Sequence, residues 1–245
     1  MAVEFYKHSR ISDDGVVKLY EVEVDKTLSR KLGKPCGKYA TVETSAVLTG
    51  AEQDYDRVSA ALSECIKRYC DGAKKVLVAG LGNPDLPADA LGDRVFKRLK
   101  ITRHLSPNKY IAALTPNVLG MTGIESFDIV CAVANRISPD VVIAVDALTA
   151  AASCRIASAF QVTDSGITPG SGVDNHRTRL DFKSLGMPVV SVGVPLVVYA
   201  STLAGEFCDA DYGCDGHDMV VTPKDVDILV DDCAKIISAA INCAF

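Results

Sequence analysis

The sequence predicts an α/β protein with three layers: a mostly parallel or mixed central sheet with helices on both faces. Short runs that are almost wholly apolar, typical of strands buried on both faces, occur at 76–80, 141–145 and 188–194. Segments between and around them carry apolar residues at every third or fourth position, which is typical of amphipathic helices. Strands and helices therefore alternate along the chain.

Length and composition narrow the class of protein. A chain of 245 residues can bury a substantial core, and no Pro/Ser-rich linker divides it, so we expect a single domain over 1–245. The formal net charge is −5 and no basic cluster occurs, which argues against a nucleic-acid or anionic-membrane partner. The expected partners are proteins or small molecules.

Cysteine usage and the N-terminus indicate a cytoplasmic protein. The nine cysteines are scattered, and several sit within apolar patterns, as free cysteines do in reducing compartments. The first residues lack a signal-peptide pattern, and no apolar run is long enough to span a membrane.

The N-terminal part, 1–45, is predicted to hold strands with a structural role. Residues 16–24 alternate apolar and charged side chains, and 39–44 do so more weakly, with a turn-rich connection between them. The period of three to four at 51–69 predicts a helix with one buried stripe.

The strand at 76–80 runs into the glycine-rich turn GLGNPDLPADALGD and then into a helix. This order brings backbone N–H groups and a helix N-terminus to the carboxyl edge of the sheet. Gly80-Leu81-Gly82 begins like a dinucleotide fingerprint, but Asp85 occupies the third glycine position. We therefore expect no nicotinamide or flavin, and no other cofactor.

Candidate catalytic acids lie in this turn and after the next buried strand. Asp85, Asp89 and Asp93 could each simply compensate the helix N-terminus, but small and apolar neighbours could partly desolvate Asp89. The apolar run 141–145 ends on Asp146, which we take as the first candidate. If Asp89 and Asp146 end adjacent strands, one can keep a proton while the other activates water, which would suit peptide-bond hydrolysis.

A strand at 110–114, a helix at 124–137 and a strand at 155–162 complete the middle of the chain and lead into a glycine-rich loop, 166–175. This loop could cradle an oxyanion or a substrate main chain, or it could be a tight connection that needs glycine dihedrals. Ser171 is a weak nucleophile candidate because PGSGV only approximates the G-x-S-x-G elbow. His176 is expected to be solvated.

The C-terminal part is read as an acidic surface loop, 206–221, followed by a helix, 222–243. The loop lacks a paired C-x-x-C and the closing Glu of a calcium loop, so no metal is expected there. Thr222 is the expected cap of the helix, with Pro223 at its first position and Asp225 completing an approximate capping box.

Seven motifs resemble, in order, the germination proteases of spore-forming bacteria. They are GLGN with PADALGD, ITRHL, TPNVLGMTGIESFDI, VVIAVDAL, TDSGITPGSGVDNHR, LGMPVVSVGVPLVV and TPKDVDILVDDCAKIISAAIN. The resemblance implies an endopeptidase of tentative aspartic type that degrades small acid-soluble spore proteins during germination, in the cytoplasm of the spore or forespore core. It also implies a zymogen, a homo-oligomer that is possibly a tetramer, and a fold similar to that of hydrogenase-maturation peptidases.

By resemblance, the matching catalytic positions are Asp89 and Asp146. We expect substrate to be bound by residues of the neighbouring motifs, namely Asn83, Thr115, Asp164, Gly166, Gly170, Ser171, Gly172, Asn175 and Arg177.

Several positions depart from the family pattern. Ala151 stands where the family has an arginine, Tyr199 stands where it has an aspartate, and the chain begins MAVE, so we expect a shortened member without the family's leader. Two alternatives therefore stay open beside the peptidase: a catalytically silent relative that binds proteins, and a metal-assisted peptidase of hydrogenase-maturation type.

Overall fold

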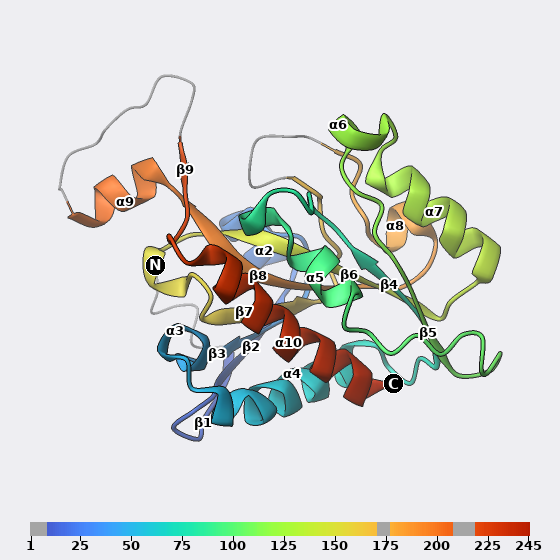
Figure 1. Cartoon of the computed structure of the whole chain (residues 1–245), viewed down its shortest axis with the longest axis horizontal. Coiled ribbons are helices and arrows are strands. Elements are labelled where there is room, and N and C mark those ends of the chain that lie inside the picture. Colours follow the sequence, from blue (N-terminus) through green and yellow to red (C-terminus); the bar gives the residue numbers. More distant parts are fainter. Residues whose placement is uncertain (1–8, 171–176, 208–218) are drawn as a thin grey trace.

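The computed structural model describes residues 9–170, 177–207 and 219–245. One mixed sheet dominates this part of the chain, with the strand order β1-β2-β3-β7-β8-β6-β4-β5 and β9 beside β8 (Figure 1). The strands are β1 (Ser9–Asp13), β2 (Lys18–Val24), β3 (Gly37–Glu43), β4 (Lys75–Gly80), β5 (Tyr110–Leu114), β6 (Val141–Ala150), β7 (Ala159–Thr163), β8 (Val189–Tyr199) and β9 (Val220–Val221).

The sheet has a parallel half and an antiparallel half. Strands β5, β4, β6 and β8 are parallel neighbours, whereas β1, β2, β3, β7 and β9 pair antiparallel. The chain leaves β4 for β5 on one side and then returns to β6 on the other side of β4. The carboxyl ends of β4 and β6 therefore flank a topological switch point, where open α/β sheets bind ligands.

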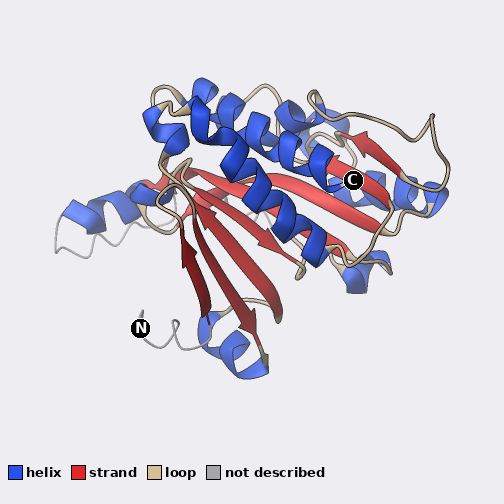
Figure 2. Cartoon of the chain, turned by 90° about the horizontal axis from the view of Figure 1, so that it is seen from below, coloured by secondary structure: helices blue, strands red, loops and turns tan. Residues whose placement is uncertain are grey.

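Helices cover both faces of the sheet, as predicted. Alternate side chains of β4 point to opposite faces of the sheet. Val76 and Val78 pack with α4, α5 and α10 on one face, whereas Leu77 and Ala79 pack with α7 and α8 on the other. Helices α4 and α10 run side by side on the first face, and Figure 2 shows the twisted strands fanning out along them. The helices are α4 (Tyr55–Tyr69), α5 (Leu91–Phe96), α7 (Ser126–Ile137), α8 (Phe182–Leu185) and α10 (Val226–Ala244).

The expected strands at 16–24 and 39–44 correspond to β2 and β3, but the connection between them holds a helix, α2 (Lys26–Leu32), where we predicted turns. Asp25 caps α2 by accepting hydrogen bonds of 2.8 Å from the backbone N–H groups of Thr27 and Leu28, and Gly33 ends it with φ 64°. No residue of α2 is buried, so the helix has no apolar stripe by which the sequence could have shown it.

The C-terminal helix begins four residues later than the sequence predicts. It starts at Val226, because the Thr222 hydroxyl donates to the carbonyl of Leu196 at 2.9 Å instead of capping the helix, and Asp225 makes no side-chain cap. The expected acidic loop, 206–221, is helical or extended at its described ends. Helix α9 (Ala200–Phe207) continues from β8 into the start of the loop, and β9 at its end pairs with β8. The rest of that loop lies outside the described residues.

Short elements connect these layers. They are α3 (Ala46–Thr49), α6 (Leu119–Thr122) and the 3-10 helices η2 (Glu52–Asp54), η3 (Pro87–Asp89) and η4 (Ser153–Arg155). Across the described ranges, no helix is both long and apolar enough to cross a membrane.

Candidate active site

A cavity of about 950 Å³ opens beyond the carboxyl end of β4 and along the second half of β6. Its lining includes the turn after β4, the last residues of β6 and β8, and residues 167–170. Leu148, Pro195 and Val197 give it an apolar part, while Asp89 and Asp146 bring two carboxyl groups to it. A concave, largely apolar site with a few converging polar groups is typical of a substrate cleft.

Asp146 reaches the cavity because it lies one residue beyond the point where β6 stops pairing with β4. The strand does not end there, where the sequence predicted its end, because β6 continues beside β8 to Ala150. Val145 pairs with Gly80 at the end of β4, and the N–H of Leu81 donates to the carbonyl of Val145 at 2.8 Å. Asp146 follows directly and is only 6% exposed. Burial, and then the negative charge of Asp89, raise the pKa of Asp146 to about 8. Its carboxyl group therefore carries a proton at neutral pH.

Asp89 is brought to the same cavity by the glycine-rich turn. Gly80 and Gly92 touch through their backbones, since a Cβ on Gly80 would lie 2.3 Å from the carbonyl oxygen of Gly92. Gly82 has φ +95°, and a Cβ there would lie 2.1 Å from the carbonyl oxygen of Asp89. The turn can fold this tightly only with glycine at these positions, and Asp89 then ends η3 within the cavity.

The two carboxyl groups have unequal surroundings. Burial raises the pKa of Asp89, but the backbone N–H of Asn83 and the positive charge of Arg177 act in the opposite direction. The N–H of Asn83 donates to Asp89 Oδ2 at 2.7 Å. Within the described residues, the backbone N–H of Ala147 is the one group that favours the charged form of Asp146. Two influences thus oppose the rise in the pKa of Asp89, whereas burial and the charge of Asp89 both raise the pKa of Asp146.

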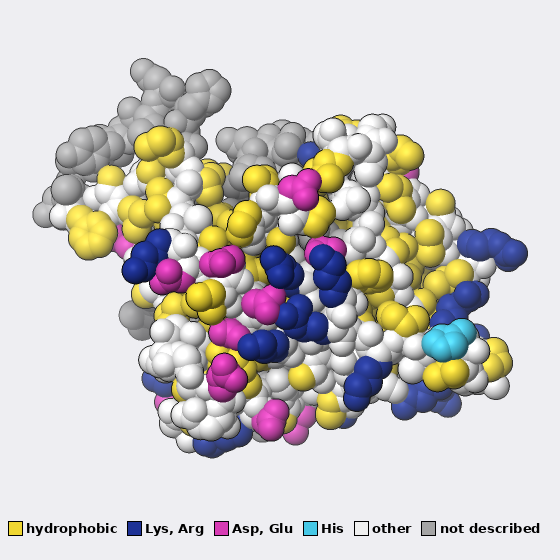
Figure 3. Space-filling view, in the orientation of Figure 1, with side chains coloured by type: hydrophobic (Ala, Val, Ile, Leu, Met, Phe, Trp, Pro, Cys, Tyr) yellow, Lys and Arg dark blue, Asp and Glu magenta, His cyan; other side chains and the backbone are white. Residues whose placement is uncertain are grey.

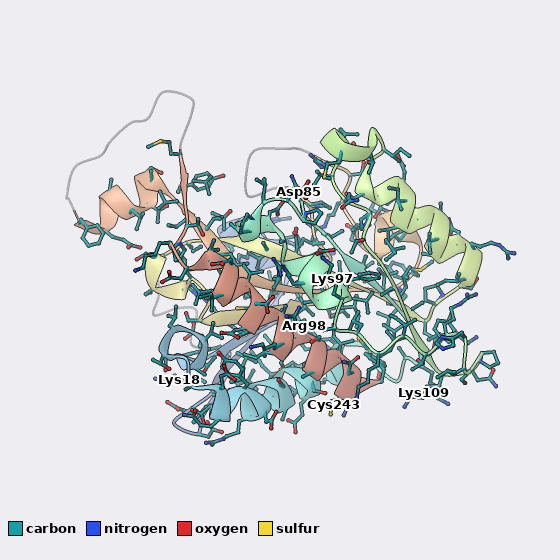
Figure 4. All side chains as sticks on the ribbon, in the orientation of Figure 1. Lys18, Asp85, Lys97, Arg98, Lys109 and Cys243 are labelled. Atoms are coloured by element: carbon teal, nitrogen blue, oxygen red, sulfur yellow. The ribbon has the colours of Figure 1, made fainter. Side chains whose placement is uncertain are left out.

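The other two acids of the turn have different roles. The backbone N–H of Asp85 donates to Asn83 Oδ1 at 3.0 Å, and Figure 4 shows Asp85 on the outer part of the loop, away from Lys97. Asp93 pairs with Lys97 at 2.7 Å along α5. Neither acid lines the cavity.

The predicted substrate-binding residues fall into three groups. Asn83, Gly170 and Arg177 line the cavity, whereas Thr115, Asp164 and Gly166 are not among its lining residues. Ser171, Gly172, Asn175 and also His176 lie outside the described residues.

Two of the residues beyond the cavity lining have structural contacts. Asp164 Oδ1 accepts a 2.7 Å hydrogen bond from the N–H of Lys38, which ties β7 to β3. Gly166 has φ +78°, and a Cβ there would lie 2.2 Å from the carbonyl oxygen of Leu180. Glycine dihedrals and a close backbone approach therefore explain Gly166.

Sequence reasoning missed two basic residues of the cavity, Lys34 and Arg155. Desolvation and then the nearby Arg155 guanidinium lower the pKa of Lys34. Arg155 pairs with Glu43 at 3.2 Å, and its Nε is buried without a hydrogen-bond partner in the described part of the chain. Lys34 follows α2 and Arg155 ends η4, so no local pattern marked either residue. Ala151 also lines the cavity, so these two residues supply positive charge to a cavity that has no arginine at 151.

Charges on the surface are mixed in sign. In the face shown by Figure 3, basic and acidic side chains are interspersed around α5 and α10. There Arg94 and Arg98 both pair with Asp231, at 3.3 and 2.5 Å. Among residues 9–170, 177–207 and 219–245, no three His, Cys, Asp or Glu side chains form a group that could hold a metal ion.

Comparison with known proteins identifies the family. The family model described as germination protease matches residues 6–213. The chain belongs to the germination protease family. This membership places it among peptidases, which are hydrolases. The seven motifs had indicated the same family.

Relatives in this family resemble the chain over most of its length. The germination protease of Clostridium tetani is 34% identical over 275 residues, covering 94% of this chain and 85% of that protein. That of Caldanaerobacter subterraneus subsp. tengcongensis is 33% identical, covering 99% and 91%. That of Bacillus subtilis is 37% identical over 211 residues, covering 80% of this chain and 57% of that protein.

Among solved structures, the [NiFe] hydrogenase maturation protease HycI of Thermococcus kodakarensis is similar to this chain at 18% identity with a TM-score of 0.44. The match covers 72% of this chain and 98% of that one.

Proposed function

We propose that the protein is an aspartic-type endopeptidase in which Asp89 activates water and Asp146 acts as the acid. The observation that carries this proposal is the pair itself: two carboxyl groups line one cavity, and Asp146 keeps its proton because it is buried beside Asp89. Two acids whose environments separate their pKa values can divide the roles of base and acid.

The steps follow from these protonation states. The Asp89 carboxylate takes a proton from a water molecule as the water oxygen attacks the peptide carbonyl carbon. Asp146 donates its proton to the carbonyl oxygen, so that the tetrahedral intermediate is neutral. When the C–N bond breaks, the proton held by Asp89 passes to the leaving nitrogen, and the hydroxyl proton of the intermediate returns to Asp146. Both carboxyl groups then have their starting protonation states.

Other residues of the cavity would bind the peptide. Leu148, Pro195 and Val197 offer apolar contact to substrate side chains. The positive charge of Arg177 favours the ionised form of Asp89, and thus its action as a base.

The substrate, location and assembly are proposed from family membership. The germination proteases to which the chain is related support a protein substrate. We propose the small acid-soluble spore proteins as that substrate, the cytoplasm of the spore or forespore core as the location, and a homo-oligomer, possibly a tetramer, as the active form.

The test is cleavage of a purified small acid-soluble spore protein by the whole chain. The variants are Asp89→Asn and Asp146→Asn, with Asp85→Asn and Asp93→Asn as controls, because these acids lie in the same segment and outside the cavity lining. We expect cleavage by the wild type and both controls, and a loss of at least about a hundredfold in each cavity variant.

Other outcomes separate the alternatives. Full cleavage by either cavity variant would refute the two-aspartate mechanism. Binding of the spore protein without cleavage by the folded wild type would favour a silent binding protein. Cleavage that stops with a chelator and returns with a divalent cation would favour the metal-assisted peptidase.

A further inference from the structure

Arg179 joins the start of the glycine-rich loop to the segment that follows the loop. Its Nη2 donates to the carbonyl oxygens of Ser165 at 2.6 Å and Gly166 at 3.1 Å. Its Nη1 donates to the hydroxyl of Thr168 at 3.2 Å, and its Nε pairs with Asp181 at 3.1 Å. One guanidinium group thus contacts three residues at the start of the loop and one residue after it.

The backbone supports the same junction. Ile167 and Leu180 form an antiparallel bridge, in which the N–H of each donates to the carbonyl of the other at 2.9 and 2.8 Å. Gly166 allows the close approach, since a Cβ there would collide with the carbonyl of Leu180. Arg179 therefore closes the base of the loop beside this bridge.

Residues on both sides of this junction line the cavity. Thr168, Pro169 and Gly170 follow it on one side, and Arg177 precedes it on the other. The charge of Arg177 acts on Asp89, so the position of the junction affects the surroundings of the carboxylate that we propose as the base.

We infer that Arg179 is a positioning residue, which fixes the base of the loop so that Arg177 and Thr168 to Gly170 keep their places in the cavity. This inference rests on the proposed peptidase function for its kinetic consequences. Arg179 is not among the residues that line the cavity, so its effect requires no direct contact with the substrate.

The contacts require arginine in particular. A guanidinium group carries donors in a rigid fork and can reach two carbonyls, a hydroxyl and a carboxylate together, whereas a lysine ammonium is a single point. Asp181 keeps a second role, because it accepts from the N–H of Ser184 at 2.9 Å in the capping box of α8. Loss of Arg179 should therefore release the segment 165–168 while α8 keeps its cap.

The experiment compares Arg179→Met and Arg179→Lys with Arg57→Met in the full chain. Arg57 is a suitable control because it pairs with Asp14 at 2.9 Å on the surface and does not line the cavity. We expect Arg179→Met to raise KM for the spore protein about tenfold and to change kcat by less than about threefold. Arg179→Lys should recover thermal stability but not KM, and Arg57→Met should leave both kinetic constants unchanged.

A double variant tests whether Arg179 acts through Arg177. In an Arg177→Met background, the added effect of Arg179→Met on kcat/KM should fall to about threefold or less, because the residue it positions has been removed. Fully multiplicative effects would overturn this part of the inference. A lower melting temperature with unchanged KM in Arg179→Met would show a structural role alone.

Amide hydrogen exchange tests the junction without any catalytic readout. The N–H groups of Ile167 and Leu180 should exchange at least about tenfold faster in Arg179→Met, relative to the N–H of Leu81, which follows β4 and donates to the carbonyl of Val145 in β6. Unchanged exchange at Ile167 and Leu180 would overturn the inference. If the wild type cleaves no substrate, the proposed function fails, and this exchange measurement still decides whether Arg179 fixes the loop.

Discussion

Asp89 in η3 and Asp146 in β6 line one cavity, and the charge of Asp89 adds to burial in raising the pKa of Asp146 to about 8. Asp89 has the N–H of Asn83 and the charge of Arg177 to support its ionised form. The surroundings of the two carboxyl groups therefore differ in how far they favour the charged form, although both residues are aspartates.

Peptidase activity should have a bell-shaped pH profile. Asp146 must keep its proton, so kcat/KM should fall as the pH rises through about 8. Asp89 must be ionised, so kcat/KM should also fall as the pH drops through its raised pKa. The two limbs report the pair as a whole, because the sites are coupled. Activity that still rises above about pH 9 would contradict these protonation states.

Arg177→Met should shift the acidic limb of that profile to higher pH. Removal of the positive charge takes away an interaction that lowers the pKa of Asp89, while burial continues to raise it. The measurement is kcat/KM against pH for Arg177→Met and for the surface control Arg57→Met. A shift of equal size in both variants would show that net charge, and not the local contact with Asp89, is responsible.

Asp146→Asn should stabilise the folded protein in a pH-dependent way. The pKa of Asp146 rises from its usual 3.8 to about 8 in the folded state, so between these values the folded chain retains a proton that the unfolded chain has released. Its contribution to the free energy of unfolding therefore decreases as the pH rises over this window.

The stabilisation by Asp146→Asn should accordingly be absent below about pH 4 and reach on the order of a few kcal/mol near pH 8. Urea unfolding of the variant and wild type at several pH values measures it. A variant that is less stable than the wild type at about pH 8 would show that the Asp146 carboxyl has a stabilising partner.

Gly92→Ala should lower the free energy of unfolding by at least about 2 kcal/mol and disturb the turn that carries Asp89. A Cβ at Gly92 would lie 2.3 Å from both the N and O atoms of Leu81, which are backbone atoms that cannot easily move. Gly205→Ala is the matched control, since nothing lies within 4 Å of its Cβ position and it sits in α9.

The control should change the free energy of unfolding by less than about 1 kcal/mol, in the stabilising direction. Thermal or urea unfolding of the two variants makes the comparison. Equal effects of Gly92→Ala and Gly205→Ala would mean that the contact between Gly92 and the backbone of Leu81 is not tight in solution.

The sequence by itself determined the alternation of buried strands and amphipathic helices, and with it the fold class. Apolar runs such as 141–145 and the period of three to four in α4 are local signals of burial, so they could be recognised without any partner segment. The seven motifs likewise determined the family. They also drew attention to Asp89 and Asp146, whose catalytic roles stay predictions.

Only the tertiary structure decided which residues meet. Asp89 and Asp146 are 57 positions apart, and they share a cavity because β4 and β6 are parallel neighbours at the switch point. Lys34 reaches the same cavity from the segment after α2 and Arg155 from the end of η4, where no periodic pattern marks them. The start of α10 depended on a hydrogen bond from Thr222 to Leu196 in β8. Such contacts join segments distant in the chain, so local patterns carry no signal of them.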